Sequence, residues 1–197
     1  MSLALPTPAA RRAALPALLL AAALALAAPP AGADEHGDAA ARAHELWKEA
    51  AGLHIEGDYE AAIGLYRRAL EIHATARIHN YLGWSLSELG RYAEAAKHSR
   101  AAIALDPDYP NAYNDLGAYL IEQGKPVEAE PWLREATRMD GYCCTHFAYY
   151  QLGRSLLLQS RIGEARGALQ TALMIHPSYQ PAIRLLAEMR ERGLQGS

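Results

Sequence analysis

Apolar residues recur at steps of three and four along the chain from residue 43 onwards, which is the spacing of amphipathic helices. Four of these periodic segments also resemble one another. They begin at Gly57, Gly90, Gly124 and Ser160 and read GDYEAAIGLYRRALEI, GRYAEAAKHSRAAIAL, GKPVEAEPWLREATRM and SRIGEARGALQTALMI. Their starts lie 33, 34 and 36 residues apart, and a period of this length is typical of stacked helical repeats.

Each repeat is predicted to contain two helices, because another apolar-periodic stretch precedes each of the four segments. We therefore expect an all-α array over residues 43–179. Its four repeats are 43–75, 76–109, 110–145 and 146–179. Residues 34–42 are expected to lead into the array. Residues 180–197 are expected to form a capping helix and tail, because the last repeat of a stack has no neighbour to cover it.

Glycine and proline mark the predicted helix ends. Gly57, Gly90 and Gly124 lie where the first helix of a repeat must stop, and glycine takes the left-handed capping conformation at least cost. Pro131 lies inside the second helix of the third repeat, where proline removes a backbone hydrogen bond. It predicts either a kink or a late start of that helix.

A short motif recurs in the first helices, where Leu-Gly is followed three residues later by leucine. The matches are Leu82, Gly83 and Leu86; Leu116, Gly117 and Leu120; and Leu152, Gly153 and Leu156. The first two turns also read Gly-x-Tyr-x-x-Ala. With these motifs, residues 43–179 resemble the tetratricopeptide repeat family. Single repeats depart from its pattern, since Pro126 replaces the turn tyrosine and Ser160 the turn glycine.

The resemblance implies a right-handed superhelical solenoid of about four helix-turn-helix repeats, with a concave groove lined by the first helices. The family's pattern places these residues in the groove: Arg77, Asn80, Trp84, Asn111, Asn114, Phe147, Tyr150 and Arg154. Asparagine amides can both donate to and accept from an extended peptide, and aromatic rings can anchor it. Alternatively, these side chains only solvate or pack an exposed helix face. We expect the partner to be another protein or a peptide segment.

Some members of the family bind a C-terminal carboxylate through lysines and asparagines. Here Arg77 and Arg154 are the only cations at the expected groove positions. An internal segment of mixed polarity is therefore the better expectation for the partner.

The N-terminus has the pattern of a secretory signal peptide. Arg11 and Arg12 precede a run of alanine and leucine, and small residues stand before a cleavage point after Ala33. The apolar run is shorter than the roughly 20 residues that a membrane span needs. We expect residues 1–33 to be removed and the mature chain to be periplasmic or secreted in a bacterium, without stable membrane insertion.

Composition and charge exclude some classes of function. Of the 19 basic residues, Arg11 and Arg12 leave with the leader, so 17 remain against 22 acidic residues. Only three are lysines, which argues against binding nucleic acid. The sequence contains no hydrolytic triad pattern and no glycine-rich phosphate loop. We expect no enzymatic activity and no cofactor, and the oligomeric state is left open.

The two cysteines, Cys143 and Cys144, lie in the connection between the third and fourth repeats, which is longer than the others. Disulfides persist in exported proteins, so the pair can form an adjacent disulfide, remain free or link to a partner. A third hypothesis adds His146 to make a soft-metal site, although structural zinc needs four ligands. The sequence thus favours a scaffold of the bacterial cell envelope, with a periplasmic thiol or metal-handling protein as the alternative.

Overall fold

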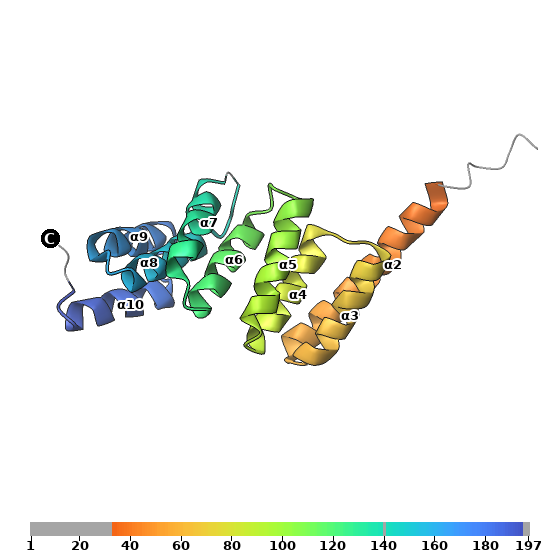
Figure 1. The fold of residues 1–197 in the computed structure, drawn as a ribbon, viewed down its shortest axis with the longest axis horizontal. Helices are drawn as coiled ribbons and strands as arrows, with labels where there is room; N and C mark the ends of the chain where they lie inside the picture. Colours follow the sequence, from red (N-terminus) through yellow and green to blue (C-terminus); the bar gives the residue numbers. More distant parts are fainter. Residues whose placement is uncertain (1–32, 140, 195–197) are drawn as a thin grey trace, which may run out of the picture. The chain divides into compact units, whose positions relative to one another are not determined.

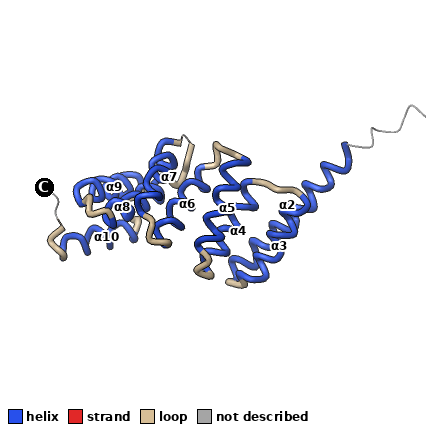
Figure 2. The backbone as a smooth tube through the Cα atoms, viewed as in Figure 1, coloured by secondary structure: helices blue, strands red, loops and turns tan. Residues whose placement is uncertain are grey.

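The computed structural model describes residues 33–139 and 141–194, and these residues form helices joined by short connections (Figures 1 and 2). The helices are α2 (Ala33–Glu56), α3 (Tyr59–Ile72), α4 (Ala76–Glu88), α5 (Tyr92–Leu105), α6 (Pro110–Glu122), α7 (Pro126–Arg138), α8 (Thr145–Leu158), α9 (Ile162–Ile175) and α10 (Gln180–Glu191). No strand occurs in this part of the chain, and the all-α prediction is confirmed. Nearly all of the predicted leader, up to residue 32, lies outside the described residues.

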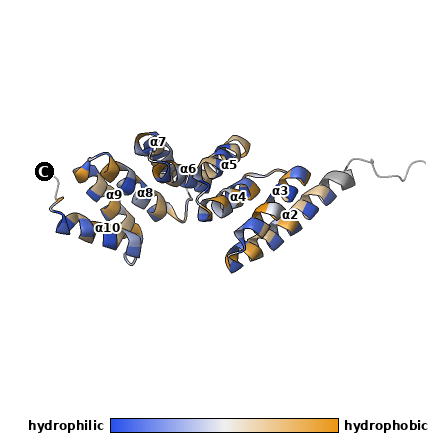
Figure 3. Ribbon diagram, turned by 60° about the horizontal axis from the view of Figure 1, so that its bottom comes forward, coloured by the Kyte–Doolittle hydropathy of each residue, from blue (hydrophilic) through white to orange (hydrophobic). Residues whose placement is uncertain are grey.

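The helices of the unit 40–197 pack as consecutive pairs. Helix α4 packs on α5, α6 on α7, and α8 on α9, and each second helix also contacts the first helix of the next pair. The first helices of neighbouring pairs touch as well, α4 with α6 and α6 with α8. Hydrophilic and hydrophobic residues both occur along these helices (Figure 3), as expected for elements that bury one face. No helix in the described part of the chain is long and apolar enough to cross a bilayer.

The turns inside the four pairs share one backbone geometry. Gly57, Gly90 and Gly124 have φ of +86°, +71° and +73°, and Ser160 adopts the same left-handed region with φ of +61°. At the last of these turns, the Arg161 amide donates to the Leu156 carbonyl at 2.9 Å, and equivalent bonds close the other three. The serine therefore performs the capping role of glycine at a higher conformational cost.

Close helix contacts occur where the sequence has small residues. A Cβ added at Gly117 would lie 2.4 Å from the side chain of Leu133, and one at Gly153 would lie 2.7 Å from Leu169. Both leucines are fully buried. The Leu-Gly motif thus lets the second helix of each of these pairs insert a leucine against the backbone of the first.

Helix α7 begins at Pro126 and continues through Pro131, so the prediction of a late start is wrong. Proline is well suited to the first helical position, where no amide donor is needed. At Pro131 the helix continues without the amide that would bond to the Val127 carbonyl. Pro131 is exposed, so the missing hydrogen bond lies on the solvent side of the helix.

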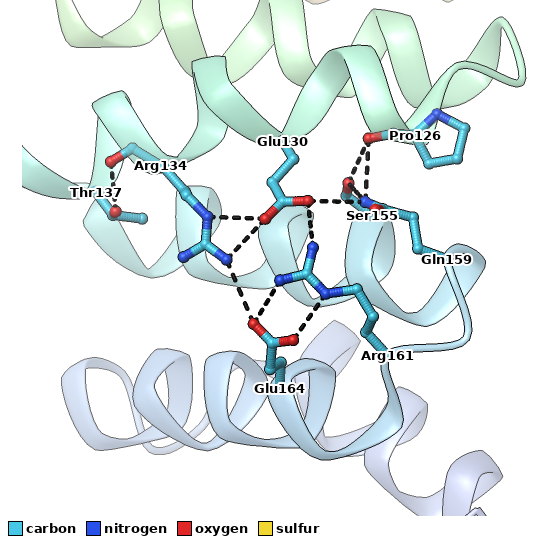
Figure 4. Close-up of polar contacts among 8 residues, drawn as sticks. All are labelled: Pro126, Glu130, Arg134, Thr137, Ser155, Gln159, Arg161 and Glu164. Carbon is cyan, nitrogen blue, oxygen red and sulfur yellow. Dashed lines mark hydrogen bonds and ion pairs between the residues drawn. The ribbon is translucent and has the colours of Figure 1, made fainter.

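A polar network joins the last two pairs (Figure 4). Glu130 of α7 accepts from Arg134 at 2.8 Å, from Arg161 at 2.6 Å and from Gln159 at 3.1 Å. Glu164 of α9 contacts both arginines. Burial opposes ionisation of Glu130, but these donors outweigh it and lower its pKa. The network therefore fixes α7 against the turn between α8 and α9.

Candidate functional site

A pocket of about 320 Å³ lies among the first helices of the second, third and fourth repeats, and we call it the central pocket. Helix α4 contributes Asn80, Tyr81, Trp84 and Ser87; α6 contributes Asn111, Asn114, Asp115 and Tyr119; the connection before α8 and its first turn contribute Tyr142, Cys144 and Phe147. Five of the eight predicted groove residues are in this set. The structure therefore brings together side chains that are up to 67 positions apart in the sequence, from residue 80 to residue 147.

The other three predicted groove residues line two further pockets. Arg77 lies beside Trp47 in a pocket of about 610 Å³, and its guanidinium carbon is 5.5 Å from the centre of the Trp47 ring. Tyr150 and Arg154 line a pocket of about 390 Å³ towards α10. Arg154 pairs with Glu122 at 2.8 Å. Both predicted groove cations are thus engaged within the chain, Arg77 in a cation–π contact and Arg154 in an ion pair.

Asp115 is the charged side chain of the central pocket, and sequence reasoning missed it. Its carboxylate accepts from the Asn80 amide at 3.0 Å through Oδ2 and from the Asn114 amide at 3.0 Å through Oδ1. Burial raises the pKa of Asp115 to about 6, although the two amide donors lower it. One feature of the sequence could have identified it: Asp115 is an acid directly before Leu116 and Gly117, one position beyond the expected groove residue Asn114.

Asn80 and Asn114 are more buried than the groove pattern suggested, with 5% and 8% of their surfaces exposed. Each amide nitrogen donates one of its two N–H groups to Asp115, so only one N–H of each side chain remains for the expected donation to a peptide. Their Oδ1 atoms are buried and have no hydrogen-bond partner. A buried polar atom without a partner costs about 1–3 kcal/mol of folding free energy. These two unsatisfied oxygen atoms are therefore an unusual feature of the side chains that line the pocket.

Aromatic rings form much of the remaining wall. Trp84 and Phe147 are 45% and 39% exposed, whereas Tyr119 and Tyr142 are buried. The Trp84 ring is held in place because its indole nitrogen donates to Glu88 at 3.0 Å and its centre lies 4.3 Å from the centre of the His54 ring. Two exposed rings, of which Trp84 is held by these contacts, are therefore open to a ligand in the pocket that Asp115 also lines.

One of the two cysteines lines the central pocket. Cys144 lines it and packs on the small cluster that contains Tyr142, whereas Cys143 is exposed. Both are free thiols with their sulfurs 3.1 Å apart. The hydrogen bond with Cys143 and partial burial raise the pKa of the Cys144 thiol, which disfavours a reactive thiolate. A disulfide between them stays a prediction.

The metal-site hypothesis finds no support in the described residues, which contain no group of three or more His, Cys, Asp or Glu side chains placed to hold a metal ion. His146 is buried and its ring contacts Phe147, His176 and Tyr179. Its environment is aromatic because the first turn of α8 packs against the residues that precede α10. The alternative function, thiol or metal handling through Cys143, Cys144 and His146, is therefore not supported.

A sequence model of the tetratricopeptide repeat family matches residues 55–110 and 81–142. Residues 55–142 of the chain belong to this family. The tetratricopeptide repeat protein shares 30% identity over 110 residues with small glutamine-rich tetratricopeptide repeat-containing protein 2 of Saccharomyces cerevisiae, which covers 55% of this chain and 32% of the yeast protein. The chain spans about a third or less of the length of the curated relatives it matches.

Solved structures of other tetratricopeptide repeat proteins have the same fold. PilW, a type IV pilus biogenesis factor, matches with a TM-score of 0.72 and 20% identity over 76% of this chain and 69% of PilW. YrrB, a tetratricopeptide repeat protein with an unusual peptide-binding site, matches with a TM-score of 0.64 and 20% identity over 74% of each chain. These likenesses confirm the predicted solenoid of helix pairs.

Proposed function

We propose that this chain is a non-enzymatic interaction scaffold and that the central pocket binds a segment of a partner protein. Tetratricopeptide repeat proteins act as protein-interaction scaffolds. The observation that carries the proposal is the position of Trp84 and Phe147, two exposed rings in one pocket shared by three consecutive repeats. Aromatic side chains in a concave site are typical anchors for protein partners.

The arrangement of the pockets also favours an extended segment of a partner as the ligand over a large flat surface. Its wall is built from the first helices of neighbouring pairs, and two further pockets continue along the array on either side, one containing Arg77 and the other Arg154. An extended segment can contact such a series of pockets one after another. The peptide-binding site named for YrrB is consistent with this use of the fold.

We also propose that the protein works in the bacterial cell envelope or outside the cell. The support is the leader pattern of residues 1–33 and the fold shared with PilW, a pilus biogenesis factor. N-terminal sequencing of the protein recovered from cell fractions tests this. A new terminus at Asp34 in the envelope or the medium is expected, and a chain that keeps Met1 in the cytoplasm contradicts it. Leu19→Arg, which interrupts the apolar run, is the matched control and should block export.

Site-specific photo-crosslinking in cells tests the scaffold proposal. A photoreactive phenylalanine analogue at position 84 or 147 should attach a discrete partner, identified by mass spectrometry. The same analogue at Met174 is the control, because Met174 is 74% exposed on α9 and lines none of the three pockets. Partners that attach at Met174 as well as at positions 84 and 147, or no attachment at the pocket, would contradict binding at this site.

A further inference from the structure

We infer that the central pocket binds a lysine or arginine side chain of the partner segment, with the Asp115 carboxylate as its counter-ion and the surrounding rings against its aliphatic stem. This inference rests on the proposed function, because it names the chemistry of the segment that the scaffold would bind. It follows from which hydrogen-bonding groups in the pocket are already used and which are not.

The pocket offers more acceptors than donors to a ligand, because each asparagine amide already uses one of its two N–H donors on Asp115. A carboxylate can only accept, so Asn80 and Asn114 must both turn their NH₂ groups towards Asp115. That orientation fixes both Oδ1 atoms on the opposite side of the amides. Two side chains that line the pocket and are more than nine-tenths buried therefore each keep an Oδ1 atom that is itself buried and has no hydrogen-bond partner.

A cationic side chain supplies the positive charge and the hydrogen-bond donors that this arrangement lacks. An ammonium group has three donors and a guanidinium has five, enough to bond the carboxylate and neighbouring oxygens at once. Hydrogen bonds between charged groups are about twice as strong as neutral ones. A carboxylate ligand would instead meet Asp115 with like charge, and an apolar ligand would leave the amide oxygens unsatisfied.

The charges and rings around the pocket favour the same ligand. None of the residues that line the central pocket is Lys, Arg or His, so Asp115 has no basic partner there. Trp84, Tyr119, Tyr142 and Phe147 provide ring faces of the kind that attract cations. The volume of about 320 Å³ is that of roughly ten water molecules, which is enough for one long side chain and its adjoining backbone.

The test uses a library of random linear peptides displayed on phage, selected on the purified chain. Selected peptides are expected to depend on Trp84 and to share a lysine or arginine. Replacing that residue by norleucine or citrulline should weaken binding to the wild-type chain by about 10- to 100-fold, the range for a charge-assisted bond. Asp115→Asn should weaken the basic peptide equally and leave the neutral peptide unchanged. Asp108→Asn removes an exposed acid outside the pocket and should have no effect.

The possible outcomes separate the two proposals. Peptides that need Trp84 but not a basic residue or Asp115 would overturn this inference and leave the scaffold function standing. The absence of any peptide that depends on Trp84 would overturn the scaffold function itself. Free spermidine that binds as tightly as the selected peptides would show a site for small amines instead of a protein segment. If Asp115→Asn fails to fold, the substituted peptides still decide the question on the wild-type chain.

Discussion

The contact between Gly117 and Leu133 gives a sharp prediction about stability. A Cβ at position 117 would lie 2.4 Å from Cγ and Cδ2 of Leu133, and Leu133 is fully buried, so its side chain cannot swing into solvent. Overpacking of a core costs about 1–3 kcal/mol, and a clash this close belongs at the upper end. The better helix propensity of alanine returns about 1 kcal/mol. Gly117→Ala should therefore lower the free energy of unfolding by about 2 kcal/mol.

Thermal unfolding followed by circular dichroism measures this effect. A loss of about 2 kcal/mol corresponds to a fall in Tm of about 4–8 °C in a chain of this size. The control is Gly167→Ala in α9, where an added Cβ would meet nothing within 4 Å and the variant should be stabilised by about 1 kcal/mol.

A double variant identifies the source of the cost. In a Leu133→Ala background the obstructing atoms are gone, so Gly117→Ala should become neutral or stabilising. The reasoning is refuted if Gly117→Ala destabilises both backgrounds equally, or if it stabilises the wild-type chain as Gly167→Ala does.

Three further predictions concern turns, buried charge and pH. Ser160→Gly should raise the free energy of unfolding by about 0.5–1 kcal/mol in urea titrations, because Ser160 has a φ of +61°. Gly90→Ser should lower it, and effects of the same sign in the two variants would contradict the turn argument. Glu130→Gln should cost about 1–3 kcal/mol in the same assay, whereas no loss would show that the network is dispensable. Asp115 has a folded pKa of about 6, above its unfolded value of about 3.9, so its contribution is present below pH 4 and is lost as the pH rises through 6. Asp115→Asn should flatten the decrease in the free energy of unfolding between pH 4 and pH 6. An unchanged decrease in the variant would show that another group causes it.

Most of the fold was predictable from the sequence, because each repeat carries its own local signals. The turn glycines, the Leu-Gly motif and the apolar spacing act within about 34 residues, so a self-comparison of the chain detects them. Ser160 shows that residue type alone does not predict every turn, since the surrounding helices impose the left-handed conformation even without glycine. Pro131 illustrates a second limit, because packing of α7 on α6 and α8 sustains a helix that local propensity disfavours.

The site was predictable only in part, because its character depends on contacts between repeats. The family's pattern identified Asn80 and Asn114 as groove residues, but each of them uses one amide donor on Asp115, a residue 35 positions beyond Asn80. Neither that pairing nor the engagement of Arg154 by Glu122 is visible in a single repeat. Which atoms remain free for a partner is thus a property of the stacked array.

The network around Glu130 limits how the array can be rearranged. Repeat proteins are built of units that contact only their neighbours, and such units can in principle be shuffled, duplicated or deleted. Here the carboxylate belongs to the third repeat, whereas Gln159, Arg161 and Glu164 belong to the fourth. Exchange of the fourth repeat alone would leave a largely buried acid facing unfamiliar side chains, and exchange of the third alone would remove the acid that Gln159 and Arg161 contact. The third and fourth repeats are therefore expected to be inherited, and engineered, as one module.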